Sequence, residues 1–228
     1  MNDTIYQAAA IIVPLIIAIV FHEVAHGWVA NALGDPTAKE RKRLSLNPLR
    51  HVDPVGTVIL PGALNLLGMP VFGWAKPVPV IKQRLRNPRF GMMAVAAAGP
   101  GSNLLMAALA AVAVGLVTSG GVAPAAGVTG FILYSLVMFI QINIFLALFN
   151  MLPIPPFDGS HIVEGLLPRA MVPGYERLAP LGFPLVLLVL VILPWLIPAF
   201  NPVGALLGGP VGWTYARYLD LIGAVAGR

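Results

Sequence analysis

The longest uncharged stretch of this chain runs for 68 residues, from Phe90 to Phe157, and a second covers residues 178–216. A helix that crosses the hydrocarbon core of a bilayer needs roughly 20 apolar residues. The longer stretch therefore has room for two such helices and a short turn. Only 10% of the residues are charged and 58% are hydrophobic, whereas a soluble domain is closer to a quarter charged. The sequence predicts an integral membrane protein.

Four spanning helices are expected from the apolar runs and the residues that interrupt them. The first should end near Gly34, because glycine favours a helix C-terminus. The third should end at the proline-rich residues 153–156, which no helix can continue through. The expected helices cover Thr4–Leu33, Met92–Val117, Val128–Leu152 and Leu181–Phe200.

The expected fold is an all-α polytopic membrane protein, a bundle of about four to six transmembrane segments. We expect one integral-membrane domain over residues 1–228, with its core at about 4–165 and a C-terminal helix and tail at 180–228. The tail from residue 201 is rich in glycine and proline and then mildly amphipathic. It fits an interfacial helix or a fifth short span.

Basic residues gather in two loops, 34–54 and 76–91, and the net charge is +5. In a polytopic chain, basic loops mark the cytoplasmic side, so we expect no nucleic acid as a partner. The prediction is a multi-pass protein of the cell (inner) membrane, with both loops in the cytoplasm and Thr118–Gly127 as an external turn. The N-terminus should lie outside, on a first helix that is retained rather than cleaved.

Residues 55–75 are apolar but interrupted by prolines and glycines. If they crossed the membrane, the basic residues of the next loop would lie outside, against the positive-inside rule. We therefore predict a re-entrant segment, shielded from lipid by protein or by a water-filled cavity. Its end, Trp74–Val80, has two prolines separated by one valine, which favours an extended edge strand over a helix.

His22, Glu23 and His26 form an H-E-x-x-H pattern inside the first apolar run. On a helix, residues four apart share a face, so both imidazoles can bind one metal ion and the glutamate can touch a water on that ion. Such a cluster is costly in hydrocarbon and indicates a functional site. The chain has no cysteine, so any metal must be held by histidine and carboxylate side chains.

A catalytic zinc site needs three protein ligands and one open position, so a third ligand has to be found. The candidates are His51, Asp53, Asp158, His161 and Glu164. Asp158 differs from the others, because it ends the 68-residue uncharged run just after the proline-rich break. A non-helical turn there can direct a carboxylate into the bundle, and Gly159 lets the backbone pass close to another helix.

Two asparagines also lie in apolar helices. Asn150 precedes Asp158 by eight residues, and Asn103 lies in the second expected helix. Either amide could orient a metal ligand or donate a hydrogen bond to an oxyanion. For Asn103, a polar contact between helices is an equally good interpretation.

These motifs together resemble the site-2 protease family of intramembrane zinc metalloproteases, in its small prokaryotic type without a PDZ or CBS domain. The resemblance depends on His22-Glu23-Val24-Ala25-His26 and, about 130 residues later, on Asn150-x-x-Pro153-x-x-x-x-Asp158-Gly159. The segments Gly73–Val78 and Gly99–Asn103 also resemble members of the family, so the similarity spans about residues 15–165. Only ten or so residues separate the second and third helices, where a PDZ domain would otherwise be inserted.

The resemblance implies that His22, His26 and Asp158 bind one Zn²⁺ per chain and that Glu23 is the catalytic base. It implies a metalloprotease domain that cleaves membrane proteins within or near their transmembrane helices. It also implies an extended, membrane-embedded segment between the first two core helices. We expect its edge, at Trp74, Lys76 and Val78, to hold an unwound substrate strand.

Two other classes of protein remain open from the sequence. A metal transporter or channel would also place histidines and acids in spans, but it predicts several ligand clusters along a path. A membrane scaffold would have a structural metal site closed by four ligands, with His161 as the fourth. The substrate, any need for an earlier cleavage and the oligomeric state are not specified by the sequence.

Overall fold

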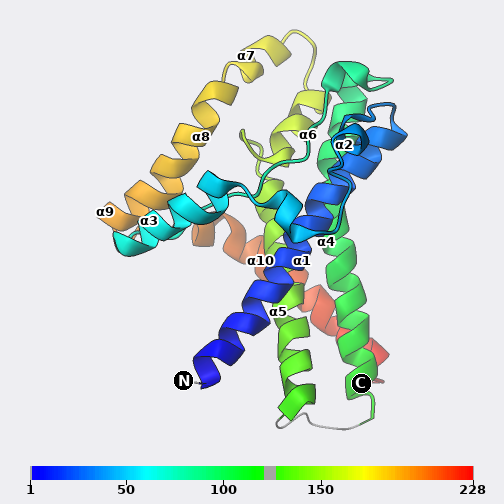
Figure 1. The fold of residues 1–228 in the computed structure, drawn as a ribbon, viewed down its shortest axis with the longest axis vertical. Coiled ribbons are helices and arrows are strands. Elements are labelled where there is room, and N and C mark those ends of the chain that lie inside the picture. The colour runs from blue at the N-terminus through cyan, green and yellow to red at the C-terminus, as the bar shows by residue number, and fades with distance from the viewer. Residues whose placement is uncertain (1, 121–126, 228) are drawn as a thin grey trace.

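The structure, a computed structural model, describes residues 2–120 and 127–227. Three long helices form its centre: α1 (Asn2–Ala32), α4 (Pro88–Thr118) and α5 (Gly127–Asn150). They contact one another and stand side by side in Figure 1. Helix α4, the second of the expected spanning helices, begins four residues earlier than expected. Its N-terminus is capped by Asn87, whose side chain accepts a hydrogen bond from the N–H of Phe90.

Four helical segments of the described residues are long and apolar enough to cross a membrane, which confirms the expected all-helical membrane protein. They are Ile5–Ala32, Pro88–Thr118, Gly127–Asn150 and Ala179–Leu196. The last is built from α8 (Ala179–Leu187), the π-helical turn η4 (Leu188–Ile192) and α9 (Leu193–Leu196).

The central core is made of small residues facing large ones. Ala107 and Ala111 of α4 pack against Ile140 and Ile144 of α5, and all four are fully buried. In a membrane, small residues let helix backbones approach closely, so that van der Waals contact holds the helices together. This packing fixes how α4 and α5 lie against each other, and both helices contribute polar groups near the histidines of α1.

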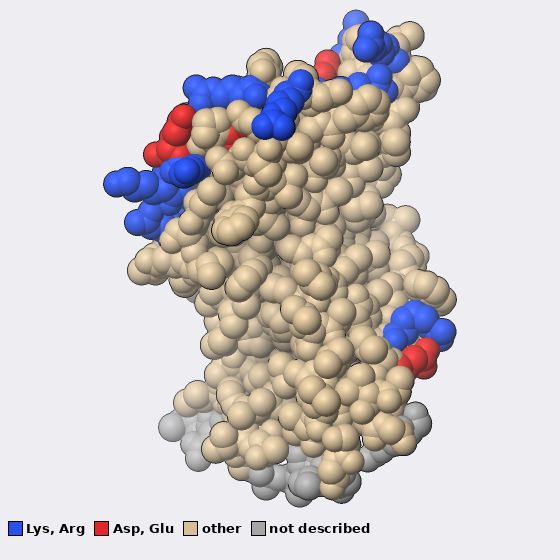
Figure 2. Space-filling model, turned by 90° about the vertical axis from the view of Figure 1, so that its right-hand side faces the viewer, with Lys and Arg blue, Asp and Glu red and all other residues tan. Residues whose placement is uncertain are grey.

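Short helices connect the long ones at the end of the bundle where charged residues gather (Figure 2). They are α2 (Thr37–Glu40), η1 (Pro48–His51), η3 (Lys82–Arg84), α6 (Asp158–Leu166) and α7 (Val172–Glu176). We refer to this end as the basic end.

The predicted re-entrant segment begins with a π-helical turn, η2 (Pro54–Ile59), which continues into α3 (Leu60–Leu66). The N–H of Lys76 donates to the carbonyl of His51 at 2.8 Å, so the segment returns to the level at which it began. Residues 69–81 have no regular secondary structure, and the described part of the chain contains no β-strand. The expected edge strand is therefore not confirmed.

The C-terminal tail forms one helix, α10 (Pro202–Val225), which passes obliquely across α4 and α5 in Figure 1. The hydroxyl of Tyr218 donates to the carbonyl of Leu104 at 2.9 Å, and Val225 lies against Gly115. Although α10 has 24 residues, it is not among the four segments apolar enough to span a membrane.

Candidate metal centre and active site

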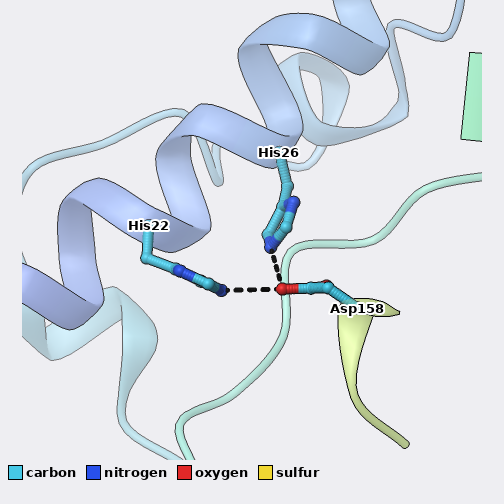
Figure 3. A group of neighbouring side chains, drawn as sticks. All are labelled: His22, His26 and Asp158. Carbon is cyan, nitrogen blue, oxygen red and sulfur yellow. Dashed lines mark ion pairs between the residues drawn. The ribbon is translucent and has the colours of Figure 1, made fainter. Parts of the chain in front are cut away.

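Helix α1 and the start of α6 bring three ionisable side chains together inside the bundle (Figure 3). Asp158 Oδ2 lies 3.1 Å from His22 Nε2 and 3.4 Å from His26 Nε2. The two histidines are buried, with 7% and 9% of their surface exposed. Within the described residues, this is the one group of three or more histidine or acidic side chains placed to hold a metal ion.

The outer nitrogens of both imidazoles bond to oxygen acceptors. His22 Nδ1 lies 2.6 Å from Asn103 Oδ1, and His26 Nδ1 lies 2.7 Å from the carbonyl of Val95. A carbonyl oxygen can only accept a hydrogen bond, so each Nδ1 must carry the proton. In the neutral imidazole, each Nε2 then presents a lone pair toward Asp158, as in metal sites where a second hydrogen bond fixes the imidazole.

This arrangement fits a cation. Three acceptor atoms converge, and the buried Asp158 Oδ2 has no hydrogen-bond partner among the described residues. Such a group is costly to bury unless a positive charge lies between the acceptors. The two separations from Asp158 Oδ2, 3.1 and 3.4 Å, are close to the edge, about 3.3 Å, of a tetrahedron of zinc ligands, and all three atoms lie within 4.8 Å of one another. A nitrogen and carboxylate donor set with one open position suits catalytic zinc.

A second asparagine orients the first. Asn103 Nδ2 donates to Asn143 Oδ1 at 2.7 Å and more weakly to the carbonyl of Ala18 at 3.3 Å. Asn143 Nδ2 in turn donates to the carbonyl of Phe139 at 2.8 Å. Because the Phe139 carbonyl can only accept, the Asn143 amide must turn its Nδ2 toward it and its Oδ1 toward Asn103. Asn103 then donates through Nδ2 to Asn143, and its own Oδ1 faces His22. We call this chain of hydrogen bonds from Phe139 to His22 the relay. Asn143 was not singled out from the sequence.

Gly99 of α4 lets the two imidazoles lie directly against a helix backbone. A Cβ atom at this position would lie 2.5 Å from His26 Nε2 and 2.6 Å from His22 Cε1. Any side chain at residue 99 would therefore displace the histidines. The sequence marked Gly99 only as part of a family segment, and its contact with the histidines is visible only in the fold.

Close backbone packing places Asp158 at the first turn of α6. A Cβ on Gly159 would lie 2.2 Å from the carbonyl oxygen of Met151, so only glycine lets the turn pass so near the end of α5. At the other end of α6, the Arg89 guanidinium donates to the carbonyls of Gly165 (2.9 Å) and Leu167. The helix that carries Asp158 is thus held at both ends.

Lys82 adds an ion pair from the neighbouring segment to Glu164 of α6. Burial alone would raise the pKa of the Glu164 carboxyl, but the hydrogen bond and charge of Lys82, with help from His161, lower it below its ordinary value. Glu164 is therefore ionised at neutral pH and forms part of the clamp on α6. It lies outside the group formed by His22, His26 and Asp158.

Glu23, between the two histidines, accepts a hydrogen bond from the backbone N–H of Val78 at 2.7 Å. Val78 lies between Pro77 and Pro79, which have no N–H. A little further along, the N–H of Ile81 donates to the fully buried Asp35 at 2.6 Å. Residues 76–81 therefore form a strap along the second half of α1, held by carboxylates near each end.

Asp35 also accepts hydrogen bonds from the first residue of α2. Thr37 donates to its Oδ1 from both the backbone N–H (3.0 Å) and the hydroxyl. Burial alone would raise the pKa of Asp35, but these bonds and the one from Ile81 lower it. Asp35 thus fixes the turn at the end of α1.

The other candidate metal ligands have different partners. His51 Nε2 lies 2.8 Å from the carbonyl of Ser45, and Asp53 caps η2 through the N–H groups of Val55 and Gly56. His161 Nδ1 is 3.5 Å from Glu164 Oε2, and its side chain lies outside the group formed by His22, His26 and Asp158. None of these three residues converges with His22 and His26.

The remaining predicted site residues are also accounted for. Asn150 Nδ2 donates to the carbonyl of Leu146 within its own helix, at 2.9 Å. The N–H of Trp74 donates to the carbonyl of Gly56 at 3.1 Å. The Trp74 ring packs edge-on against Phe183 of α8, with centroids 5.1 Å apart. The expected substrate edge therefore lies between η2, α8 and the second half of α1.

A donor set that fits zinc, a glutamate between two histidines and a bundle of membrane-length helices define a class, the polytopic membrane metalloproteases. Comparison with known proteins agrees. Residues 120–193 match peptidase family M50. The chain is also 37% identical over 184 residues to the Bacillus subtilis (strain 168) protein named "Putative zinc metalloprotease YwhC". The aligned residues cover 81% of this chain and 80% of the relative. No solved structure matches significantly.

The chain therefore belongs to peptidase family M50, the site-2 protease family. It is a metalloprotease, and the metal of the family is zinc. The family predicted from the two separated motifs is confirmed.

Proposed function

We propose that this protein is an intramembrane protease that hydrolyses peptide bonds within or near the transmembrane helices of membrane proteins. One observation carries the proposal: the histidines that face Asp158 belong to α1, inside a 28-residue segment long and apolar enough to cross a membrane. A protease with its metal at that depth acts on chains that share the bilayer.

In this mechanism His22, His26 and Asp158 hold the metal. Zinc bound there would act as a Lewis acid on the scissile carbonyl and lower the pKa of water. One oxygen of Glu23 is held by the Val78 N–H, which leaves the other free. Glu23 accepts the proton of the attacking water and then gives it to the leaving amine.

The site lies nearer the basic end of the bundle. His22 follows Ile5 by 17 residues, which is roughly 25 Å of helix. We assign the basic end to the cytoplasm, because basic loops stay on that side. In this orientation the protein lies in the inner membrane of the cell. Water would reach the site from the cytoplasm.

The substrate helix must unwind before it can be cut, because its backbone hydrogen bonds shield its peptide bonds. The edge near Trp74, Lys76 and Val78 can hold the unwound strand. The N–H groups of these three residues are already bonded within the protein. In an extended chain, the backbone N–H and C=O groups of successive residues point to opposite edges. The carbonyls of the intervening Ala75, Pro77 and Pro79 would therefore face the substrate and accept hydrogen bonds from its N–H groups.

The asparagines have different roles in this proposal. Asn103 orients His22 through the bond at 2.6 Å. Asn150 lies at the end of α5, close in sequence to the turn before Asp158. Its amide can serve a developing oxyanion if it turns away from the Leu146 carbonyl.

The transporter and scaffold alternatives are less well supported. A transport path predicts several clusters of ligands, and the described residues contain one. A structural site needs a fourth protein ligand, but the expected one, His161, pairs with Glu164 instead.

Quantitative mass spectrometry of membrane protein fragments tests the proposal. Cells that carry the active protein should accumulate fragments cut within transmembrane helices, and cells that carry Glu23→Gln should not, because the amide cannot accept the proton. Identical fragments in both strains would show that this protein does not cut them.

A further inference from the structure

Helix α10 has a charged, outward-facing surface that the proposed protease activity does not use. Arg217 Nη2 and Asp220 Oδ2 form an ion pair at 3.1 Å, and their side chains are 60% and 64% exposed. The Arg217 guanidinium carbon also lies 6.0 Å from the centre of the Trp213 ring, and Trp213 is 68% exposed. Residues 213, 217 and 220 share one face of the helix.

This surface lies beside the membrane-spanning part of α4. Tyr218, between the charged residues, donates to the carbonyl of Leu104, which precedes the end of α4 at Thr118 by 14 residues, or roughly 21 Å. Val225, further along α10, packs on Gly115 near that same end. Figure 2 shows one acid–base patch set apart from the charged end, within an otherwise uncharged surface.

An ion pair at this depth is unfavourable against lipid, and charged side chains of membrane helices normally face protein or a water-filled cavity. The surface cannot turn inward, because the opposite side of α10 already packs on the core. That side is formed by Val211, Tyr215, Tyr218, Leu221 and Ile222. Arg217 and Asp220 already neutralise each other, and a protein surface packed over this ion pair would shield it from lipid.

We propose that the surface formed by Trp213, Arg217 and Asp220 binds the same surface of a second copy of this chain. One acid and one base on a single helix face are self-complementary, so a two-fold axis can place Arg217 of each copy against Asp220 of the other. Tryptophan and arginine are enriched among the residues that contribute most of the binding energy at protein interfaces.

The neighbouring backbone leaves room for a second helix. A Cβ on Gly209 or Gly212 would meet no described atom within 4 Å, apart from the adjacent residues and the nearby backbone of α10 itself. Small residues of this kind let two membrane helices approach closely.

Charge reversal tests the pairing. Arg217→Asp gives a chain with two acids on this face, and Asp220→Arg gives a chain with two bases. The protein is reconstituted in lipid vesicles, and subunits are counted by single-molecule photobleaching. We expect wild type to be dimeric, each variant alone to be monomeric, and a mixture of the two variants to form heterodimers.

Arg177→Asp, the same charge change at an exposed position outside α10, is the matched control and should stay dimeric. Zinc content, measured on every sample, should equal that of wild type and shows that the site is intact. A monomeric wild type would overturn the proposal, as would variants that dimerise alone or fail to pair when mixed. The readout is independent of cleavage, so the proposed protease function can fail without affecting this result.

Discussion

The backbone N–H of Val78 donates a 2.7 Å hydrogen bond to Glu23 Oε2. It joins the strap to the glutamate of the H-E-x-x-H helix. The flanking residues, Pro77 and Pro79, cannot donate, so no neighbouring N–H can replace that of Val78. The buried Val78 side chain also lies beside Gly27 of α1, so the strap is packed against the helix as well as bonded to it.

Val78→Pro removes this donor, and Val78→Ala keeps it. A hydrogen bond to a charged group contributes about 1.5–3 kcal/mol, so the proline variant should lose roughly 10- to 100-fold in kcat. Zinc content should not change in either variant, because Val78 does not touch the metal-binding group. A proline variant with the kcat of the alanine variant would show that the bond does not hold the base.

Gly99→Ala should disturb the metal centre. The added Cβ would lie 2.5 Å from His26 Nε2, so the imidazoles must move and zinc should be lost from most of the protein. Gly101→Ala, in the same helix but with open space around it, is the control and should bind zinc as wild type does. Both changes favour helix by about 1 kcal/mol, so the comparison isolates the contact with the histidines.

Asn143→Leu should weaken zinc binding although Asn143 touches neither the metal ligands nor the metal. Without its oxygen, the Asn103 amide loses the bond that fixes its direction, and His22 loses its orientation. Outer partners of this kind typically contribute 10- to 100-fold in metal affinity. Competition with a fluorescent chelator measures the change. Asn150→Leu is the control, and equal zinc affinities for the two variants would refute the relay.

The orientation in the membrane can be tested with single cysteines, because the chain has none of its own. Cysteines at Ser45 and Gln83 should resist an impermeant thiol reagent in intact cells, whereas one at Ser119 should react. Labelling at position 83 but not at 45 would mean that residues 55–75 cross the membrane.

The spanning helices and the meeting of His22, His26 and Asp158 at one place could be predicted from the sequence because charges are so scarce in this chain. His22, His26 and Asp158 stand out against apolar neighbours, and proline-rich residues mark where α5 ends. Among the uncharged residues, Asn103 could be singled out as a polar residue in an apolar helix, and it contacts His22, but two other contacts could not be predicted. Asn143 and Gly99 reach the site only through packing between helices far apart in sequence.

Two other features also depended on tertiary structure. Residues 54–66 form helical turns despite their proline and glycine, because Asp53 caps the first turn and Trp74 packs beside it. The path of α10 follows from its contacts with α4 and α5. These contacts could not be predicted from the sequence of α10 alone.

Zinc analysis of purified protein tests the central claim most directly. Wild type and Glu23→Gln should each contain one zinc per chain, because Glu23 serves as the base and not as a ligand. Asp158→Ala should lose zinc, and Asp158→Asn should be nearly as damaging, since a neutral amide is a poor zinc ligand. A full zinc equivalent in folded Asp158→Ala protein would contradict the assignment of His22, His26 and Asp158 as the metal site.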